Sequence, residues 1–167
     1  MILTRDEILK LINEKELIID PFSIHNLGPA SYDLTLDNVF RIQKPNTILE
    51  AREDYDIDKY TEKIIAYEYT LMPGELILGL TKERIKMPSY LVGWLQGRSR
   101  FARIGLMIHI TANLVQPGVN NKQVLEIYNA SNRPIKIFAG TKICQIIFEY
   151  TKGNATYNGK YKNQEDV

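Results

Sequence analysis

The sequence predicts a single, mainly β domain of the sandwich or barrel type with one short N-terminal helix. Short runs rich in β-branched and aromatic residues recur between residues 64 and 150. Turn signals such as Pro73-Gly74 and Pro117-Gly118 separate these runs. Many short strands at this spacing are typical of a sandwich or barrel. The chain has 167 residues, which suits one domain with its own core.

Residues 4–14 are predicted to form the helix, because Ile8, Leu11 and Ile12 make an apolar stripe at helical spacing. Thr4 and Glu7 have the spacing of a capping box, in which each side chain bonds the other residue's backbone N–H. The apolar period then changes from that of a helix to that of strands.

A half-buried strand is predicted for residues 31–36, where Tyr32, Leu34 and Leu36 alternate with polar residues. Residues 50–63 are mostly charged and are interpreted as a solvated loop or exposed hairpin. An acidic metal site is the less favoured alternative there, because clustered carboxylates mostly lie at the surface.

Seven further runs are predicted as strands, each ending at a turn signal. They are residues 64–71, 75–85, 90–96, 105–115, 122–130, 135–139 and 142–150. The polar, Gly-containing residues 151–167 are predicted to be a mobile end.

Charge and composition limit the partners and the location. The net charge is +1, so no bulk field attracts nucleic acid or an anionic membrane, and an anionic ligand needs a local positive cluster. No apolar run is long enough to span a bilayer, and the N-terminus lacks the layout of a signal peptide. The single cysteine, Cys144, cannot form an intramolecular disulfide, so we expect a cytoplasmic protein.

The same residue counts exclude one class of enzyme. Zinc-dependent nucleobase deaminases hold their metal with His and Cys, in a signature like H-x-E followed by P-C-x-x-C. The chain has only His25, His109 and Cys144 and cannot build that zinc site.

The densest positive cluster is GRSRFAR, with Arg98, Arg100 and Arg103 around Ser99. One interpretation is a solvated loop edge, since long charged side chains are normally exposed. The other is a polyphosphate cradle, because guanidinium groups match phosphate oxygens bidentately and a hydroxyl adds a donor.

Glu126 interrupts VLEIY, a run that otherwise fits a packed strand. In a strand it shares a face with Val124 and Tyr128. That face is either solvated or lines a closed pocket in which the carboxylate exchanges protons. His109 has no accompanying ligand spacing and is interpreted as a packed strand residue.

These stretches, with ASYDLTL and YNGKYKNQ, resemble the dCTP deaminases of the dUTPase-like superfamily. The resemblance covers nearly the whole chain. It implies a distorted β-barrel or jelly-roll-like (β-clip) subunit over residues 1–156, assembled as a homotrimer with sites between subunits. Residues 157–167, called the tail below, would close over the bound nucleotide. It also implies no zinc, with Mg²⁺ arriving on the triphosphate of dCTP.

The resemblance assigns a role to each matching position. Glu126 would be the general base and acid, Ser99 and Ala112 would hold the attacking water, and Arg103 would orient the Glu126 side of the site. The residues expected to contact substrate come from three segments. They are Arg98, Ser99, Arg100, Phe101, Ala102, Arg103, Ala112, Gln116, Val124, Leu125, Glu126, Tyr157, Lys160 and Gln164.

Four positions depart from the family pattern around the sugar and phosphates. Arg100 replaces a usual Ser, Gln116 an Asp, Val119 an aromatic residue and Asn121 a Gly. The leading hypothesis is hydrolytic deamination of dCTP to dUTP and ammonia in dUTP/dTTP biosynthesis. A dUTPase or a bifunctional dCTP deaminase/dUTP diphosphatase is the alternative. A non-catalytic nucleotide binder is disfavoured, because a carboxylate near polyphosphate would repel it.

Overall fold

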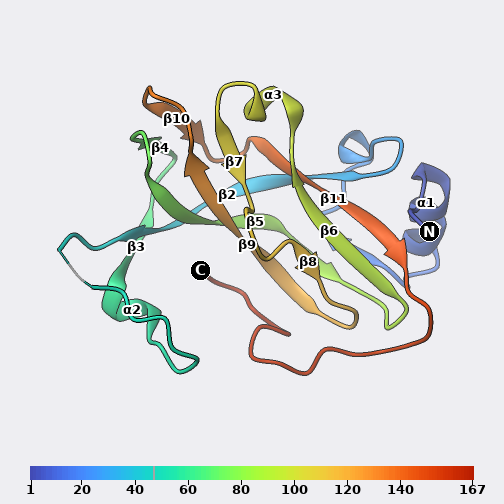
Figure 1. Cartoon of the computed structure of the whole chain (residues 1–167). Helices are drawn as coiled ribbons and strands as arrows, with labels where there is room; N and C mark the ends of the chain where they lie inside the picture. The colour runs from blue at the N-terminus through green and yellow to red at the C-terminus, as the bar shows by residue number, and fades with distance from the viewer. Residues whose placement is uncertain (47) are drawn as a thin grey trace.

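The computed structural model describes residues 1–46 and 48–167, and strands dominate its fold (Figure 1). Its helical elements are α1 (Arg5–Asn13), the 3-10 turn η1 (Ile24–Asn26), α2 (Ile57–Tyr60) and α3 (Ser99–Ala102). The strands in the first half are β1 (Ile18–Asp20), β2 (Tyr32–Gln43), β3 (Thr61–Ile65), β4 (Glu68–Leu71) and β5 (Leu76–Lys86). The second half contributes β6 (Leu91–Gly97), β7 (Leu106–Ile108), β8 (Leu114–Val115), β9 (Asn120–Asn129), β10 (Ile135–Phe138) and β11 (Lys142–Tyr150).

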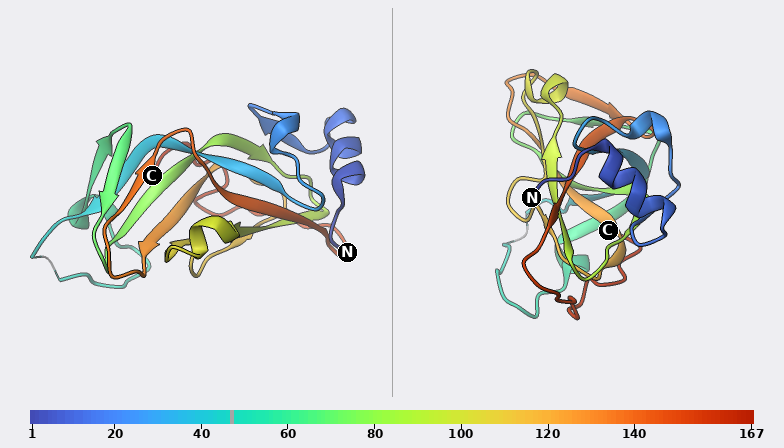
Figure 2. Two further views of the ribbon diagram at one scale, coloured as in Figure 1. Left: turned by 90° about the horizontal axis from the view of Figure 1, so that it is seen from above. Right: turned by 90° about the vertical axis from the view of Figure 1, so that its right-hand side faces the viewer.

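Within the described residues, nine strands form one curled sheet in the order β7-β9-β5-β2-β11-β6-β8, with β1 on β5 and β3 on β2. All these pairings are antiparallel. Strands β4 and β10 pair separately. The sheet bends around the core, and α1 lies at one end of it (Figure 2). The predicted mainly β, distorted-barrel fold with one N-terminal helix is confirmed.

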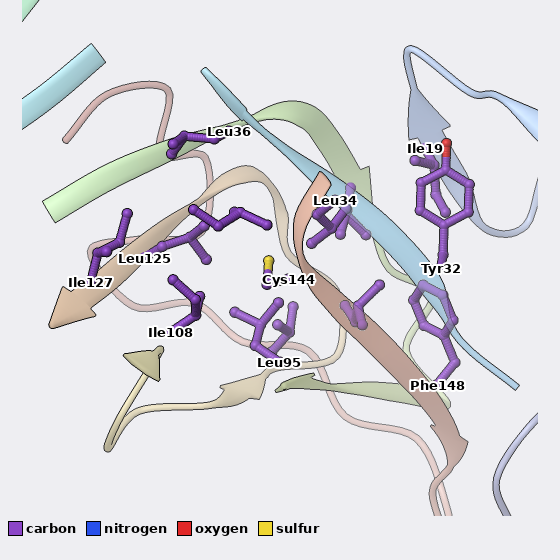
Figure 3. Packing of buried hydrophobic residues seen from close by; sticks show 14 of the residues in the cluster. Ile19, Tyr32, Leu34, Leu36, Leu95, Ile108, Leu125, Ile127, Cys144 and Phe148 are labelled. Atoms are coloured by element: carbon purple, nitrogen blue, oxygen red, sulfur yellow. The ribbon is translucent and has the colours of Figure 1, made fainter. Parts of the chain in front are cut away.

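The core fills the inside of the curl. Leu34 and Leu36 of β2, Leu125 and Ile127 of β9 and Cys144 of β11 all point into it (Figure 3). Tyr32, Leu34 and Leu36 are fully buried and alternate with partly exposed residues, as the sequence predicts. Since alternate residues of a strand point to opposite faces, burying Leu125 and Ile127 turns Val124 and Glu126 away from the core.

The capping box predicted for α1 is not formed. Thr4 is the N-cap, but its side chain makes no cap hydrogen bond. The Glu7 carboxylate instead accepts a hydrogen bond of 2.7 Å from the Tyr150 hydroxyl of β11. That contact holds the pKa of Glu7 below its ordinary value and raises the pKa of Tyr150 to about 12. Tyr150 of a distant strand therefore binds the Glu7 side chain, which the local pattern assigned to the helix N-terminus.

Residues 50–63 are mostly exposed, as predicted for a solvated loop or exposed hairpin, and they contain α2 and the start of β3, which pairs antiparallel with β2. Asp56 caps α2 by accepting from the Asp58 N–H at 3.1 Å. No group of three or more His, Cys, Asp or Glu side chains suited to a metal occurs in residues 1–46 and 48–167. None of the helices in the same residues is long and apolar enough to cross a membrane.

The predicted strand 105–115 is broken in the structure. β7 pairs with β9 and ends at Ile108, while β8 begins at Leu114 and pairs with β6. The Pro117-Gly118 turn therefore links strands from different parts of the sheet and does not close a hairpin. Gly118 has φ +76°, a conformation that favours glycine. The break between β7 and β8 is where the candidate site begins.

Candidate active site

Glu126 lies on β9 with its side chain on the face opposite the core and is half-buried. Its Oε2 accepts hydrogen bonds from the backbone N–H groups of Ile110 and Thr111, each at 3.0 Å. The Thr111 hydroxyl lies 3.3 Å from both carboxylate oxygens. Charge-assisted bonds of this kind are the stronger class of hydrogen bond. They fix the position of the carboxylate before any ligand arrives.

His109 makes this arrangement possible by turning the chain. Its backbone has φ +57°, a left-handed conformation that His adopts more readily than most residues. Its own N–H still continues the ladder to Glu126 O at 2.7 Å. The next two N–H groups leave the ladder and point to the Glu126 side chain. The interpretation of His109 as a packed strand residue is therefore wrong, because it ends the strand.

The His109 ring closes the same loop. Its Nε2 lies 2.7 Å from Ala112 O, and since a carbonyl only accepts, Nε2 carries the proton. Nδ1 is buried and has no hydrogen-bond partner within the described residues. Ala112 O thus already accepts one hydrogen bond and keeps a second lone pair free for a water or ligand.

A cavity of about 490 Å³ opens over this face of β9. Besides His109, Glu126 and Lys122 are the ionisable side chains from β9 and its flanking loop that line it. Lys122 is paired with Asp37 Oδ2 at 3.0 Å, so its charge is neutralised inside the protein. The remaining lining from β8 and the following turn is apolar or amide in character, including Leu114, Gln116 and Val119. Among the described residues, Glu126 is the one carboxylate side chain that lines the cavity.

The tail lines the cavity with several of its residues. In Figure 1 it is the end of the red segment that leaves β11 and finishes beside β9. The N–H of Asn120 donates to Lys162 O at 2.8 Å, and the N–H of Lys122 donates to Gln164 O at 2.9 Å. From the first bond to the second, β9 and the tail each advance by two residues in the same direction. The tail therefore lies beside β9 as a short parallel strand would. Tyr157, Tyr161 and Gln164 line the cavity from this side.

Gly118 lets the tail approach closely. A Cβ at Gly118 would lie 2.5 Å from Thr156 Cγ2, inside any normal contact distance. The N–H of Tyr157 donates to Pro117 O at 2.9 Å in the same place. Gly118 is therefore required both for its backbone conformation and for the space that the tail occupies.

Sequence reasoning missed one wall of the cavity. Tyr55 and Ile57, from the segment predicted as a solvated loop, both line it. Burial and the neighbouring Tyr161 raise the pKa of the Tyr55 hydroxyl. The two aromatic residues within the acidic run, Tyr55 and Tyr60, were the available signal that this segment contacts the protein.

The arginine segment, residues 98–103, lies elsewhere. It follows β6 and contains α3, at the end of the molecule opposite the tail (Figures 1 and 2). Ser99, Arg100 and Arg103 are exposed, and neither Arg100 nor Arg103 has a side-chain partner among residues 1–46 and 48–167. Arg98 pairs with Asp33 at 3.0 Å and donates to Lys142 O at 2.7 Å.

A single chain thus brings together only part of the predicted site. The predicted residues that line the cavity are Ala112, Gln116, Val124, Glu126, Tyr157 and Gln164. Leu125 is on the core side of β9 and fully buried, so only its backbone could face a ligand. Those outside the cavity lining are Arg98, Ser99, Arg100, Phe101, Ala102, Arg103 and Lys160.

Cys144 takes no part in this chemistry. It is fully buried at the centre of the core, and burial raises the pKa of its thiol strongly (Figure 3). A thiol that stays protonated is a poor nucleophile, so Glu126 remains the reactive candidate.

Comparison with known proteins agrees with this geometry. The dCTP deaminase-like family model matches residues 2–151. A protein of Persephonella marina named "dCTP deaminase, dUMP-forming" is 39% identical over 98% of this chain and 93% of its own. One of Clostridium botulinum (strain Eklund 17B / Type B) with the same name is 41% identical over 100% of this chain and 94% of its own. A Marinomonas protein named "dCTP deaminase" is 36% identical over 95% and 91%.

Solved structures share the fold at low identity. The 2'-deoxycytidine 5'-triphosphate deaminase from Agrobacterium tumefaciens matches with a TM-score of 0.66 and 20% identity, over 88% of this chain and 47% of that one. A mutant dUTPase from phage phi11 of S. aureus matches with a TM-score of 0.55 and 14% identity, over 86% and 96%. The near-complete matches to curated relatives and to the family model place the chain in the dCTP deaminase-like family.

Proposed function

We propose that the protein hydrolyses the exocyclic amine of dCTP, which gives dUTP and ammonia. The observation that carries the proposal is the Glu126 carboxylate, held by two backbone N–H groups at the wall of a nucleotide-sized cavity. The names of the relatives from Persephonella, Clostridium and Marinomonas support the same reaction.

In this reaction Glu126 moves protons. It takes one from a water molecule, whose oxygen attacks C4 of the cytosine ring. The carboxylic acid then protonates N3. The carboxylate next takes the proton of the new C4 hydroxyl and passes it to the amine, so that the C4–N bond breaks, the C4 carbonyl forms and ammonia leaves. The free lone pair of Ala112 O and the Ser99 hydroxyl are suited to hold the water. General acid–base catalysis of this kind contributes about 10²–10⁴-fold.

The backbone and the tail supply substrate contacts in this proposal. Val124 and Leu125 present backbone groups of β9 to the base. Tyr157, Lys160 and Gln164 cover the triphosphate, and Mg²⁺ arrives bound to its oxygens. We also propose a cytoplasmic location, where deoxynucleotide substrates are present and a free thiol stays reduced.

We further propose a homotrimer in which a neighbouring subunit brings its arginine segment to the Glu126 cavity. Two observations support this assembly. The guanidinium groups of Arg100 and Arg103 are exposed and have no side-chain partner in residues 1–46 and 48–167, so they are available to an anionic ligand in a neighbouring site. Apolar side chains around α3, β7 and the Glu126 loop are also uncovered, between 37% and 53% exposed. They are Ile104, Met107, Ile110 and Leu114.

A second candidate is the bifunctional reaction that continues to dUMP, favoured by relatives named "dUMP-forming" at 39% and 41% identity. Gln116 lines the cavity and argues against efficient cleavage of the α–β phosphate link. Its amide oxygen can position a water or a sugar hydroxyl but has no useful basicity. We therefore favour deamination as the main activity.

The test is to incubate the protein with dCTP and with dUTP, each with magnesium, and to measure ammonia and pyrophosphate separately. We expect ammonia from dCTP and little pyrophosphate from dUTP. A Gln116→Asp variant should gain pyrophosphate release while keeping ammonia release. Pyrophosphate from dUTP at a rate comparable with ammonia from dCTP would establish the bifunctional reaction in its place.

A further inference from the structure

The last three residues of the tail each contact a different cationic side chain of the barrel. Glu165 pairs with Arg84 of β5, and Asp166 pairs with Lys63 of β3. Val167 O accepts from Arg41 Nε of β2 at 3.1 Å. None of these three cationic residues lines the cavity, although Val167 does, so the contacts hold the tail at the edge of the space that it covers.

Arg41 connects this end of the tail to the other wall of the cavity. It is 8% exposed, and besides Val167 O it contacts the Asp58 carboxylate and the Thr61 hydroxyl. Asp58 belongs to α2, the helix that also contains Ile57. The end of the tail and the Tyr55–Ile57 wall are thus held by one buried guanidinium group.

The remaining contacts of the tail are too few to hold it down alone. Three backbone hydrogen bonds join it to Asn120, Lys122 and Pro117, and the Asn121 amide donates to Tyr161 O at 2.6 Å. Water can replace such bonds at an exposed edge, and ordering the tail costs conformational entropy. Attraction between opposite charges at residues 165 and 166 shifts this balance towards the closed arrangement.

The charge pattern of the tail supports the same conclusion. Residues 157–164 carry Lys160 and Lys162 and no acidic residue, whereas Glu165 and Asp166 are adjacent. The acidic pair lies opposite Arg84 and Lys63. The sign of the charge therefore selects which part of the tail reaches the cationic side of the barrel.

We propose that Glu165, Asp166 and Val167, with Arg84, Lys63 and Arg41, form an ionic latch that holds residues 157–164 over the cavity before any nucleotide binds. Closure then does not depend on phosphate contacts alone. Its consequence for dCTP turnover rests on the proposed function, but the latch itself is a property of the free protein.

The experiment measures hydrogen exchange of the Asn120 and Lys122 amides in the full-length protein without nucleotide. Both amides donate to the tail and lose that partner when it lifts, whereas the Met87 amide donates to Val119 O at 2.8 Å and serves as an internal reference. Lys63→Glu reverses one charge of the latch, and Lys63→Glu with Asp166→Lys restores the pair. Lys63 is chosen because Arg84 also contacts Asn120 and Arg41 is buried.

Lys136→Glu is the matched control, since Lys136 forms an ion pair of similar exposure with Glu68 at 2.8 Å, away from the tail. We expect Lys63→Glu to speed exchange at Asn120 and Lys122 about two- to fivefold, as one partly exposed ion pair allows. The double variant should restore the slow rate, Lys136→Glu should have no effect, and added salt should mimic Lys63→Glu.

Unchanged exchange in Lys63→Glu, or no recovery in the double variant, would overturn the latch. A second measurement follows the KM for dCTP, which should rise in Lys63→Glu and recover in the double variant. If the protein does not deaminate dCTP, the exchange rates still report on the latch, so the two proposals can fail separately.

Discussion

The Glu126 cavity and the arginine segment differ in how completely the subunit satisfies their polar groups. Around Glu126, two backbone N–H groups and a hydroxyl hold the carboxylate, and the tail covers the space above it. In the arginine segment, Arg98 is paired with Asp33, while Arg100 and Arg103 are exposed and have no side-chain partner in the described residues. The protein thus satisfies the Glu126 carboxylate itself, although the nearby His109 Nδ1 has no partner in the described residues, and it leaves the two guanidinium groups to solvent.

This difference fits separate roles for the Glu126 carboxylate and for the guanidinium groups of the arginine segment. A proton-transfer group must be positioned to within a fraction of an ångström, so it benefits from a loop of its own chain. Guanidinium groups that neutralise phosphate act over longer distances and can come from another subunit.

Glu126→Gln should abolish deamination, by about 10²–10⁴-fold, because an amide cannot shuttle protons. The amide oxygen can still accept from Ile110 and Thr111, so the loop should stay in place and nucleotide affinity should remain within about tenfold. Ammonia release and calorimetric binding measure the two effects. Near-normal turnover would remove Glu126 from the mechanism.

Arg103→Ala should also inactivate the enzyme, and mixing it with Glu126→Gln in one assembly should restore activity. If the two regions meet only between subunits, random assembly gives about a quarter of the sites both intact residues. Ammonia release by the co-expressed, doubly tagged assembly measures this recovery. Activity no higher than that of the two variants alone would show that both residues act within one subunit.

Deleting residues 157–167 should raise the KM for dCTP about tenfold or more and leave the fold intact. The tail contacts the cavity mostly through polar groups, so it adds closure and exclusion of water with little core. Steady-state kinetics and thermal unfolding measure the two effects. An unchanged KM would mean that the tail does not contact substrate.

Acid should release the end of the tail. The Lys63 ammonium holds the pKa of Asp166 below its ordinary 3.8, so this carboxylate stabilises the docked tail above that pH. The contribution is lost only as pH falls through the lowered value. Protection factors of Asn120 and Lys122 should therefore stay constant from neutral pH to about pH 4 and fall below it.

The effect should be small, because Asp166 is half exposed and solvent screens its charge. Asp166→Asn is the control and should show low protection at all pH values. A pH profile identical to that of Asp166→Asn would mean that the ion pair contributes nothing to docking.

Local patterns determined much of the fold and the identity of the reactive group. The alternation of Tyr32, Leu34 and Leu36 predicts the buried face of β2, because the side-chain period of a strand is two residues. The same period turns Glu126 away from the core once Leu125 and Ile127 are buried. A charged residue inside an apolar strand was sufficient to single out Glu126.

Only the tertiary structure decided which groups meet. Thr4 and Glu7 have the spacing of a capping box, yet Tyr150 of β11, a distant partner in sequence, takes Glu7. The pattern around His109 predicts one strand. In the structure the N–H groups of Ile110 and Thr111 donate to the Glu126 carboxylate, so the strand pairing ends there. Local propensity is weak compared with a charge-assisted hydrogen bond. Local sequence patterns also do not show which residues far apart in the chain will meet.

The same reason explains the cavity wall and the arginine segment. Tyr55 lies in a charged run whose composition indicates solvent, and only the docked tail gives it a neighbour in Tyr161. Arg103 and Glu126 are 23 positions apart in the sequence, but they lie on different surfaces of the folded subunit. Sequence identified the chemical groups from their types and spacing, whereas distances between them depend on how the sheet curls and which strands pair.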